Sequence, residues 1–262
     1  MKKVFFMLMT AIALVAMVSC NKDDNKNKGN KGNGGNNETE DLITIDGNLD
    51  EWASIKGAAT AELDEAFAYP GLQVMKAIAD ETNIYVYFEY ELQDAVDTEE
   101  PQTDSPFEIF VDSDDNATTG GYTWLWGDAE DETYKVGYEY MLESEAGWLE
   151  GTKVVDMSES MNIYNFDGVD GVDAWAEGGH LTQLQLNSFC ESAGKVVDGM
   201  AFVEVAVLRS VVNCSKPGKC NIGIVAYSTY KNDKDETLWP TTGVLPQGAA
   251  AGAERMLEVA LP

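Results

Sequence analysis

Apolar and polar residues alternate along most of the chain after residue 41. In the segment 134–140, for example, a Tyr or Val occupies every second position. A period of two, rich in β-branched and aromatic residues, is typical of β-strands that bury one face. The pattern predicts strands at residues 42–45, 74–79, 84–92, 107–112, 134–142, 148–155, 180–186, 201–207, 222–230 and 256–260.

Turn-forming residues separate these strands, as at Asp115-Asn116 and Asp167-Gly168. Residues 58–67 are the only segment whose pattern allows a helix. Many short strands with a turn every ten or so residues are typical of two packed sheets. We therefore predict an all-β fold, an antiparallel β-sandwich of the jelly-roll or immunoglobulin-like kind, formed by residues 42–262 as one domain.

The N-terminal segment carries a different pattern. Two lysines precede an apolar run, residues 4–18, which ends at Ser19 and Cys20. The run is too short to span a bilayer as an anchor. It resembles a bacterial lipoprotein signal with its lipobox at residues 17–20, which implies that residues 1–19 are removed and that Cys20 is acylated with palmitate. Ordinary secretion with a chance cysteine is the alternative.

The segment that follows is predicted to be a flexible tether. Residues 21–40 contain seven Asn, four Gly and four Lys and no apolar residue. Such a chain has a root-mean-square reach of roughly 25 Å and no means of forming a core. Its first residues, 21–24, resemble the acidic export signal of Bacteroidota lipoproteins. The resemblance implies a lipid-anchored protein on the outer face of the outer membrane, with residues 20–41 as the lipidated Cys and the flexible tether.

Net charge narrows the choice of ligands. The chain carries 17 Lys and Arg against 46 Asp and Glu, a formal charge of −29. Phosphate backbones would be repelled by so acidic a surface, which excludes nucleic acids as partners. Cations and neutral molecules are the favoured ligands.

The cysteines after Cys20 allow one short bridge. Cys214 and Cys220 flank a turn-rich loop, and in an oxidising compartment they are expected to form a disulfide. Cys190 then has no partner and is expected to be a buried thiol.

Five segments in order resemble the family 9 carbohydrate-binding modules and their relatives in the DOMON-like group. The most specific are the opening I-T-I-D-G-N-L-D-E-W, residues 43–52, and the strand F-E-I-F-V-D-S-D, residues 107–114. The remaining segments are residues 74–86, 202–207 and 239–240. The resemblance implies a β-sandwich of the carbohydrate-binding-module type that binds a polysaccharide or oligosaccharide, often with calcium, and carries no catalysis.

The resemblance also implies site residues. Trp239 matches one of two tryptophans that sandwich the sugar, and Glu108 matches a ligand-contacting carboxylate. Lys135 stands where an Arg contacts the sugar, and Gly137 where an Asn does. The second tryptophan falls near Gln102, so its aromatic face is missing from this chain.

Two other tryptophans offer a substitute platform. Trp124 and Trp126 are two residues apart and share one face if the segment is extended. An aromatic ring can stack on the apolar C–H face of a sugar. Core packing is the alternative for both rings, and it is the favoured interpretation for Trp148 and Trp175.

A cation site is predicted where a strand ends in acidic residues. Asp112, Asp114 and Asn116 are spaced i, i+2, i+4, so that their oxygens converge on one side of an extended loop, as a hard cation such as Ca²⁺ needs. The loop is no EF-hand, because Ala117 and Thr123 stand where that motif places its Gly and Glu. A solvated acidic hairpin is the alternative.

The opening motif is interpreted as a structural turn. Gly47 is expected to adopt a positive φ, with Asp46, Asp50 and Glu51 around it. Trp52 is expected to plug one end of the sandwich.

An enzyme is not predicted. His180 is the only histidine and begins an alternating strand, and no G-x-S-x-G motif, Cys–His pair or zinc spacing is present in the sequence. A glycosidase-type carboxylate pair is the catalytic arrangement that 46 acidic residues leave open.

The sequence thus favours a cell-surface lipoprotein that binds glycan without catalysis, is stabilised by calcium and cooperates with outer-membrane glycan-uptake proteins. The first alternative is a calcium-dependent structural or adhesion module that binds another surface protein. A haem-binding DOMON relative would need an axial ligand, for which the chain offers His180 and scattered methionines.

Overall fold

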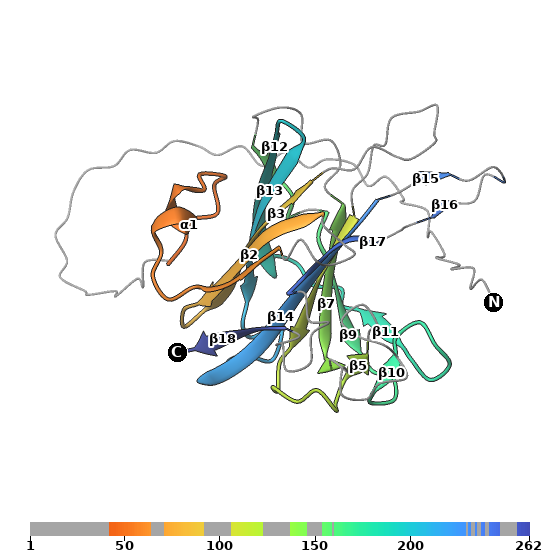
Figure 1. Cartoon of the computed structure of the whole chain (residues 1–262). Helices are drawn as coiled ribbons and strands as arrows, with labels where there is room; N and C mark the ends of the chain where they lie inside the picture. Colours follow the sequence, from red (N-terminus) through yellow and green to blue (C-terminus); the bar gives the residue numbers. More distant parts are fainter. Residues whose placement is uncertain are drawn as a thin grey trace, which may run out of the picture. The chain divides into compact units, whose positions relative to one another are not determined.

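The computed structural model describes most of one compact unit, residues 40–262. Described are residues 42–63, 71–91, 106–122, 137–145, 154–158, 160–228, 230–231, 234, 237–238, 241–246 and 256–262. Nearly all of the regular structure in these ranges is antiparallel β-sheet (Figure 1). In the described ranges, the helical segment falls short of the length and apolarity that a membrane span requires.

The first layer is a six-stranded antiparallel sheet with strand order β1-β2-β3-β13-β12-β8. Its strands are β1 (Ala59–Glu62), β2 (Leu72–Ala79), β3 (Asn83–Glu91), β13 (Met200–Leu208), β12 (Cys190–Val197) and β8 (Val155–Asp156). β13 pairs with β3 over nine residues and with β12 over eight, so it is bonded on both sides along its whole length.

The second layer is a seven-stranded antiparallel sheet with order β11-β9-β7-β4-β14-β17, in which β18 also pairs with β14. Its strands are β11 (Leu181–Gln183), β9 (Asn162–Phe166), β7 (Tyr140–Glu145), β4 (Pro106–Asp112), β14 (Gly218–Tyr227), β17 (Thr241–Leu245) and β18 (Leu257–Leu261). Two small sheets complete the described strands: β10 (Val172–Asp173), β5 (Gly121–Tyr122) and β6 (Gly137–Tyr138) form one, and β15 (Tyr230–Lys231) and β16 (Thr237–Leu238) the other.

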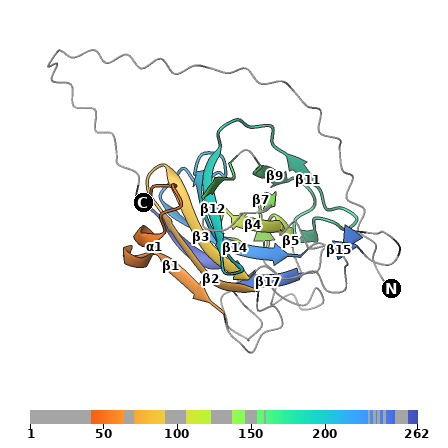
Figure 2. The same cartoon turned by 90° about the horizontal axis from the view of Figure 1, so that it is seen from above.

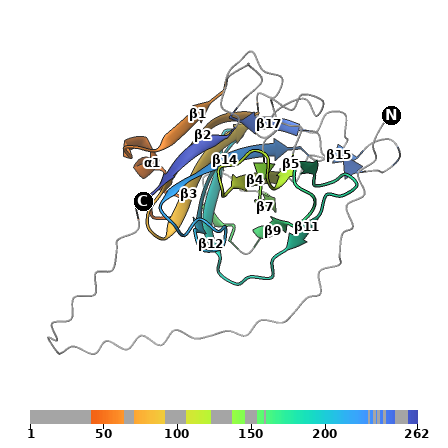
Figure 3. The ribbon, with the colours of Figure 1, turned by 90° about the horizontal axis from the view of Figure 1, so that it is seen from below.

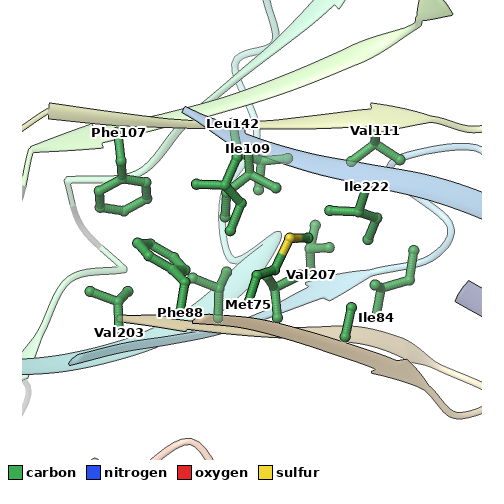
Figure 4. Packing of buried hydrophobic residues seen from close by; sticks show 14 of the residues in the cluster. Met75, Ile84, Phe88, Phe107, Ile109, Val111, Leu142, Val203, Val207 and Ile222 are labelled. Carbon is green, nitrogen blue, oxygen red and sulfur yellow. The ribbon is translucent and has the colours of Figure 1, made fainter. Parts of the chain in front are cut away.

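The main core lies between the two large sheets. Figure 4 shows side chains of the two layers meeting, Phe107, Ile109 and Val111 from one sheet against Phe88 and others from the facing sheet. Phe88 and Phe107 contact edge to face across this interface, with ring centroids 5.0 Å apart. These buried apolar faces are the hydrophobic driving force that holds the layers together. The predicted all-β antiparallel sandwich is therefore confirmed.

Several predicted strands match the structure closely, and others do not. The predictions at 74–79, 84–92, 107–112 and 201–207 correspond to β2, β3, β4 and β13. The helix expected at 58–67 is wrong: its described part contains the strand β1 instead. The strand expected at 42–45 is also wrong, since this segment is irregular and leads into the short helix α1 (Asp50–Ser54).

A third layer covers the outer side of the six-stranded sheet. Figures 2 and 3 show α1 on the side of β2 and β3 that faces away from β4 and β7. Trp52 of α1 is buried and stacks on Tyr87 of β3, with ring centroids 5.4 Å apart. Trp52 is therefore a packing residue, as expected, although it covers a sheet face and does not plug the end of the sandwich. Gly47 has the predicted positive φ, +78°.

One buried carboxylate joins this layer to the sheet. Glu204 of β13 accepts hydrogen bonds from the backbone N–H groups of Asp46 (3.0 Å) and Gly47 (2.6 Å) and from Trp52 Nε1 (3.1 Å). Burial raises the pKa of Glu204, and these three donors lower it in part. The carboxylate satisfies three donors, of which Gly47 N and Trp52 Nε1 are buried, so its loss would leave them without their partner.

Glu204→Ala is expected to lower the free energy of unfolding by about 3 kcal/mol or more, because each buried unpaired donor costs about 1 kcal/mol or more. For a domain of this size the melting temperature should fall by about 6 °C or more, as scanning calorimetry would record. Glu191→Ala, on an exposed position of the neighbouring strand β12, is the control and should melt with the wild type. A Glu204→Ala protein that melts within about 2 °C of the wild type would contradict this role.

Candidate ligand face and cation site

The seven-stranded sheet is apolar on both sides. Along β4, Phe107, Ile109 and Val111 point into the main core, so Glu108 and Phe110 lie on the opposite face. We call this opposite side the outer face. It is packed by a second buried cluster: Phe110, Tyr138, Met141, Phe166, Ala174, Val225, Val244 and Met256.

Polar groups cross the outer face in a row that spans four neighbouring strands. Glu108 of β4 and Glu143 of β7 are directly opposite each other in the strand register. Tyr227 of β14 donates a hydrogen bond to Glu108 Oε2 at 2.6 Å. Tyr164 of β9 hydrogen-bonds Glu143 on the other side. We call these four residues the carboxyl row.

The two carboxyl groups of the row resist ionisation. Burial raises the pKa of Glu108 to about 7; the hydrogen bond from Tyr227 opposes this, and the charge of Glu143 adds to it. Burial likewise raises the pKa of Glu143, against the hydrogen bond from Tyr164. Burial also keeps the pKa of Tyr227 well above its ordinary value, so its hydroxyl remains a donor. Near neutral pH the row therefore offers both donors and acceptors.

This arrangement suits a neutral ligand that carries many hydroxyl groups. Carboxyl and phenol groups exchange hydrogen bonds with hydroxyls, and the rings of Tyr164 and Tyr227 are only partly buried where they pack against the second cluster. A few convergent polar groups on an apolar surface are the usual composition of a small-molecule site.

An acidic cluster lies where β4 ends. One carboxylate oxygen each from Asp112, Asp114 and Glu139 can be chosen so that all lie within 4.8 Å of one another. Glu139 stands between β6 and β7, where its N–H donates to Val111 O at 3.1 Å and its carbonyl accepts from Phe166 N at 2.8 Å. Backbone hydrogen bonds thus hold the third carboxylate against the loop that carries the other two.

Glu139 is only half satisfied by its neighbours. Its Oε2 accepts hydrogen bonds from Ser113 N (2.8 Å) and Ser113 Oγ (3.2 Å), but its Oε1 is buried and has no partner among the described residues. Burial raises the pKa of Glu139 to about 7. The hydrogen bond from the backbone N–H of Ser113 opposes this rise, and the charges of Asp114 and Asp112 add to it. Burial also raises the pKa of Asp112.

These three acids can hold a metal ion. A cation would neutralise their repulsion and would give the buried Glu139 Oε1 a partner, and oxygen donors of this kind suit a hard cation. The nearby cation Lys219 pairs with Asp115 Oδ2 (2.9 Å) and Glu258 Oε2 (2.7 Å).

The predicted ligands and the observed cluster overlap in part. Asp112 and Asp114 are in the cluster, and Glu139 was missed because the alternation of the segment made it an ordinary solvent-facing position. Asn116 shapes the turn: its Oδ1 accepts from Thr118 N (3.1 Å) and Thr118 Oγ1 (2.8 Å), while its own N–H donates to Asp112 Oδ1 (3.2 Å). Its role as a metal ligand stays a prediction.

Several predicted residues lie outside the described ranges: Cys20, Trp124, Trp126, Lys135 and Trp239. Of the predicted sugar contacts, Glu108 is the one that the structure describes, and it is in the carboxyl row. Trp175, expected in the core, is 51% exposed, which corrects that expectation. His180 is exposed and hydrogen-bonds Asp167.

The two cysteines predicted to form a bridge lie together. Cys214 and Cys220 are both buried, and here they are thiols that hydrogen-bond each other. That contact lowers the pKa of Cys214, which the nearby Arg209 guanidinium lowers further. The Cys214–Cys220 disulfide stays a prediction. The two thiol groups lie within hydrogen-bonding distance of each other.

The described residues define a two-sheet β-sandwich with an aromatic, carboxyl-bearing outer face and an acidic loop at the end of β4. Two solved structures of family 9 carbohydrate-binding modules from Caldicellulosiruptor kristjanssonii are similar to the chain. The module in complex with cellotriose has a TM-score of 0.39 and 13% identity, over 84% of this chain and 89% of that chain. The module in complex with glucose has a TM-score of 0.38 and 13% identity, over 84% and 91%.

No protein-family model matches the sequence, and a search of curated proteins gave no match. At so low an identity and TM-score, neither structural similarity assigns a ligand to this chain.

A cation at the acidic cluster is expected to stabilise the fold. Calcium at about one hundred times its Kd should add about 2.7 kcal/mol, a rise of about 5 °C or more in melting temperature over the chelated protein. Glu139→Gln should abolish most of this rise, because it replaces the half-satisfied carboxylate by a neutral amide. Glu62→Gln, an equal change of charge on the exposed edge strand β1, should keep the full rise. Equal melting temperatures with calcium and with chelator would contradict the site.

Ionisation of Glu108 is expected to cost stability in alkaline solution. Its pKa in the fold, about 7, exceeds the ordinary 4.5, so both states are protonated below about pH 4.5 and no cost arises there. As the pH rises through 7 the folded state must ionise a buried group. Glu108→Gln should therefore gain about 7 °C in melting temperature relative to the wild type between about pH 4 and pH 8.5.

The control for this measurement is Glu81→Gln, the same substitution in the exposed turn between β2 and β3, which leaves Glu108 in place. A constant difference between Glu108→Gln and the wild type across this range would show that Glu108 ionises freely in the fold.

Proposed function

We propose that the protein is a non-catalytic glycan-binding module whose ligand lies on the outer face of the seven-stranded sheet. The observation that carries the proposal is the carboxyl row, in which Glu108 and Glu143 stand side by side with a tyrosine hydroxyl at each end. A neutral polyhydroxylated ligand meets both donors and acceptors there and needs no counter-charge. Sugars are such ligands, and the family resemblance of the sequence independently favours them.

We assign a binding role to the two glutamates. Burial raises the pKa values of both Glu108 and Glu143. Each group also has its own tyrosine donor. The pair is therefore suited to holding the hydroxyl groups of a ligand.

We propose calcium as the ion of the acidic cluster. The donors of Asp112, Asp114 and Glu139 are all carboxylate oxygens, and Ca²⁺ accepts such oxygens in irregular numbers and geometries. The cluster is joined to the outer face through Glu139, which directly follows Tyr138 of the aromatic cluster. A bound ion would thus stiffen the loop beside the ligand and leave the ligand contacts to the row.

We further propose that Cys20 anchors the protein by lipid to the outer face of the outer membrane. The lipobox at residues 17–20 and the polar segment 21–40 support this. A tether with a reach of roughly 25 Å would hold the sandwich close to the membrane and leave it free to turn towards a polysaccharide. Outer-membrane glycan-uptake proteins are the partners that this location favours.

Titration calorimetry against a panel of plant and host glycans, cello-oligosaccharides included, tests the function. We expect binding in the presence of calcium and a loss of about tenfold or more in affinity for Glu108→Ala. Tyr227→Phe should lose about fivefold, since it removes one hydroxyl that bonds a carboxyl group. Glu81→Gln, in the turn after β2, should bind as the wild type does. Failure of the wild type to bind any glycan would overturn the proposal.

A second candidate function would then remain. The acidic cluster alone is compatible with a calcium-dependent structural or adhesion module that binds another surface protein. That function predicts the calcium-dependent rise in melting temperature together with no glycan affinity for the wild type. The two measurements on one protein sample therefore separate the candidates.

A further inference from the structure

The loop between β9 and β11, residues 167–180, exposes an indole ring. Trp175 is 51% exposed and Val169 is 60% exposed. Figure 1 shows this segment, with β10 in it, extending outward next to β9 and β11. An aromatic side chain of this size is mostly buried in folded proteins, because its burial contributes more than that of other side chains.

Hydrogen bonds hold the loop in one conformation. Asp167 N donates to His180 O at 3.1 Å, and Val169 N donates to Gly178 O at 2.8 Å, which closes the loop at its base. Trp175 N donates to Asp173 Oδ1 at 2.8 Å, so a side chain of the loop itself holds the backbone of Trp175. The exposed ring thus stands on an ordered support, and a ligand that contacts it would not have to order the loop first.

The loop is attached to the outer face. Ala174, the residue before Trp175, is buried in the same cluster as Tyr138 and Phe166. The pKa of Tyr138 is raised mainly by burial, and the charges of Glu108 and Asp173 raise it further. Tyr138 therefore lies within electrostatic reach of the carboxyl row and of the Trp175 loop. Trp175 stands at the margin of the proposed ligand face.

The surroundings of the ring favour a sugar over a protein partner. A stable protein interface buries about 800 Å² on each side and has an apolar centre. In the loop, the large exposed apolar residues are Trp175 and Val169, and acidic groups, Asp173 and Glu177, lie within two residues of the ring. An aromatic face among hydrogen-bond acceptors matches the C–H face and the hydroxyl groups of a saccharide.

We propose that Trp175 is a second sugar-binding contact, which stacks on a unit of an oligosaccharide chain whose neighbouring units occupy the carboxyl row. The inference rests on the proposed function and deepens it: the ligand is a chain, because the ring and the row are separate parts of one face. Longer oligosaccharides should therefore bind more tightly than short ones, because they also contact Trp175. The family resemblance does not identify Trp175 as a site residue.

Titration calorimetry with oligosaccharides of graded length tests the inference. The probes are β-1,4-glucan, β-1,4-xylan and α-1,4-glucan oligosaccharides from one unit to about six units. For the series that binds, we expect Trp175→Ala to lose affinity increasingly with length, reaching about tenfold for the longest probe. Trp175→Phe, which keeps an aromatic face, should recover most of this loss.

Leu186→Ala is the matched control, since Leu186 is another exposed apolar residue, 43% exposed, beyond the end of β11. It should bind every probe as the wild type does. A Trp175→Ala protein with wild-type melting temperature and wild-type affinity for every length would overturn the inference and leave the proposed function standing. A wild type that binds no saccharide would overturn both.

Discussion

The alternation of β4 and β14 between two buried faces is the constraint on which this molecule depends. In an ordinary two-layer sandwich each sheet buries one face and leaves polar residues on the other. Here the seven-stranded sheet packs the main core on one side and a second aromatic cluster on the other. Glu108 of β4 and Glu143 of the neighbouring strand β7 are outward residues beside this second cluster. Glu108 and Glu143 acquire their chemistry from that placement.

Three glutamates, one buried and two half-buried, show how surroundings assign different roles to one residue type. Glu204 receives three N–H donors and joins the helical layer to the sheet. Glu108 receives a single phenol and faces another carboxyl group, so it resists ionisation. Glu139 has one satisfied oxygen and one buried oxygen without a partner in the described structure, beside two aspartates. Three N–H donors make Glu204 a structural link. Apolar neighbours and the charge of Glu143 keep Glu108 from ionising. Glu139, beside two aspartates, belongs to a cluster that could hold a metal ion.

Strands with a distinct local sequence pattern could be predicted from the sequence. Features that arise from contacts between distant segments could not. The residues 107–112 are so rich in aromatic and β-branched side chains that the sequence predicts β4, and Glu108 came from the family resemblance. β12 contains Ser192, Gly194 and Lys195 and shows no alternation, because its identity as a strand comes from pairing with β13 over eight residues. Glu139 joins Asp112 only through the fold, since 26 residues separate Glu139 from Ser113. The exposure of Trp175 likewise depends on how its loop closes.

The contact of residues 46 and 47 with Glu204 would have a mechanical consequence if the chain is anchored at Cys20, as proposed above. A bound polysaccharide that is dragged by flow would transmit tension through the tether into the segment that starts at residue 42. That segment is held by the buried Ile43 and by two backbone amides on one carboxylate. The carboxylate belongs to β13, which is bonded to a neighbour on both sides. Tension on that segment would therefore reach β13, which lies in the interior of the six-stranded sheet and is not an edge strand.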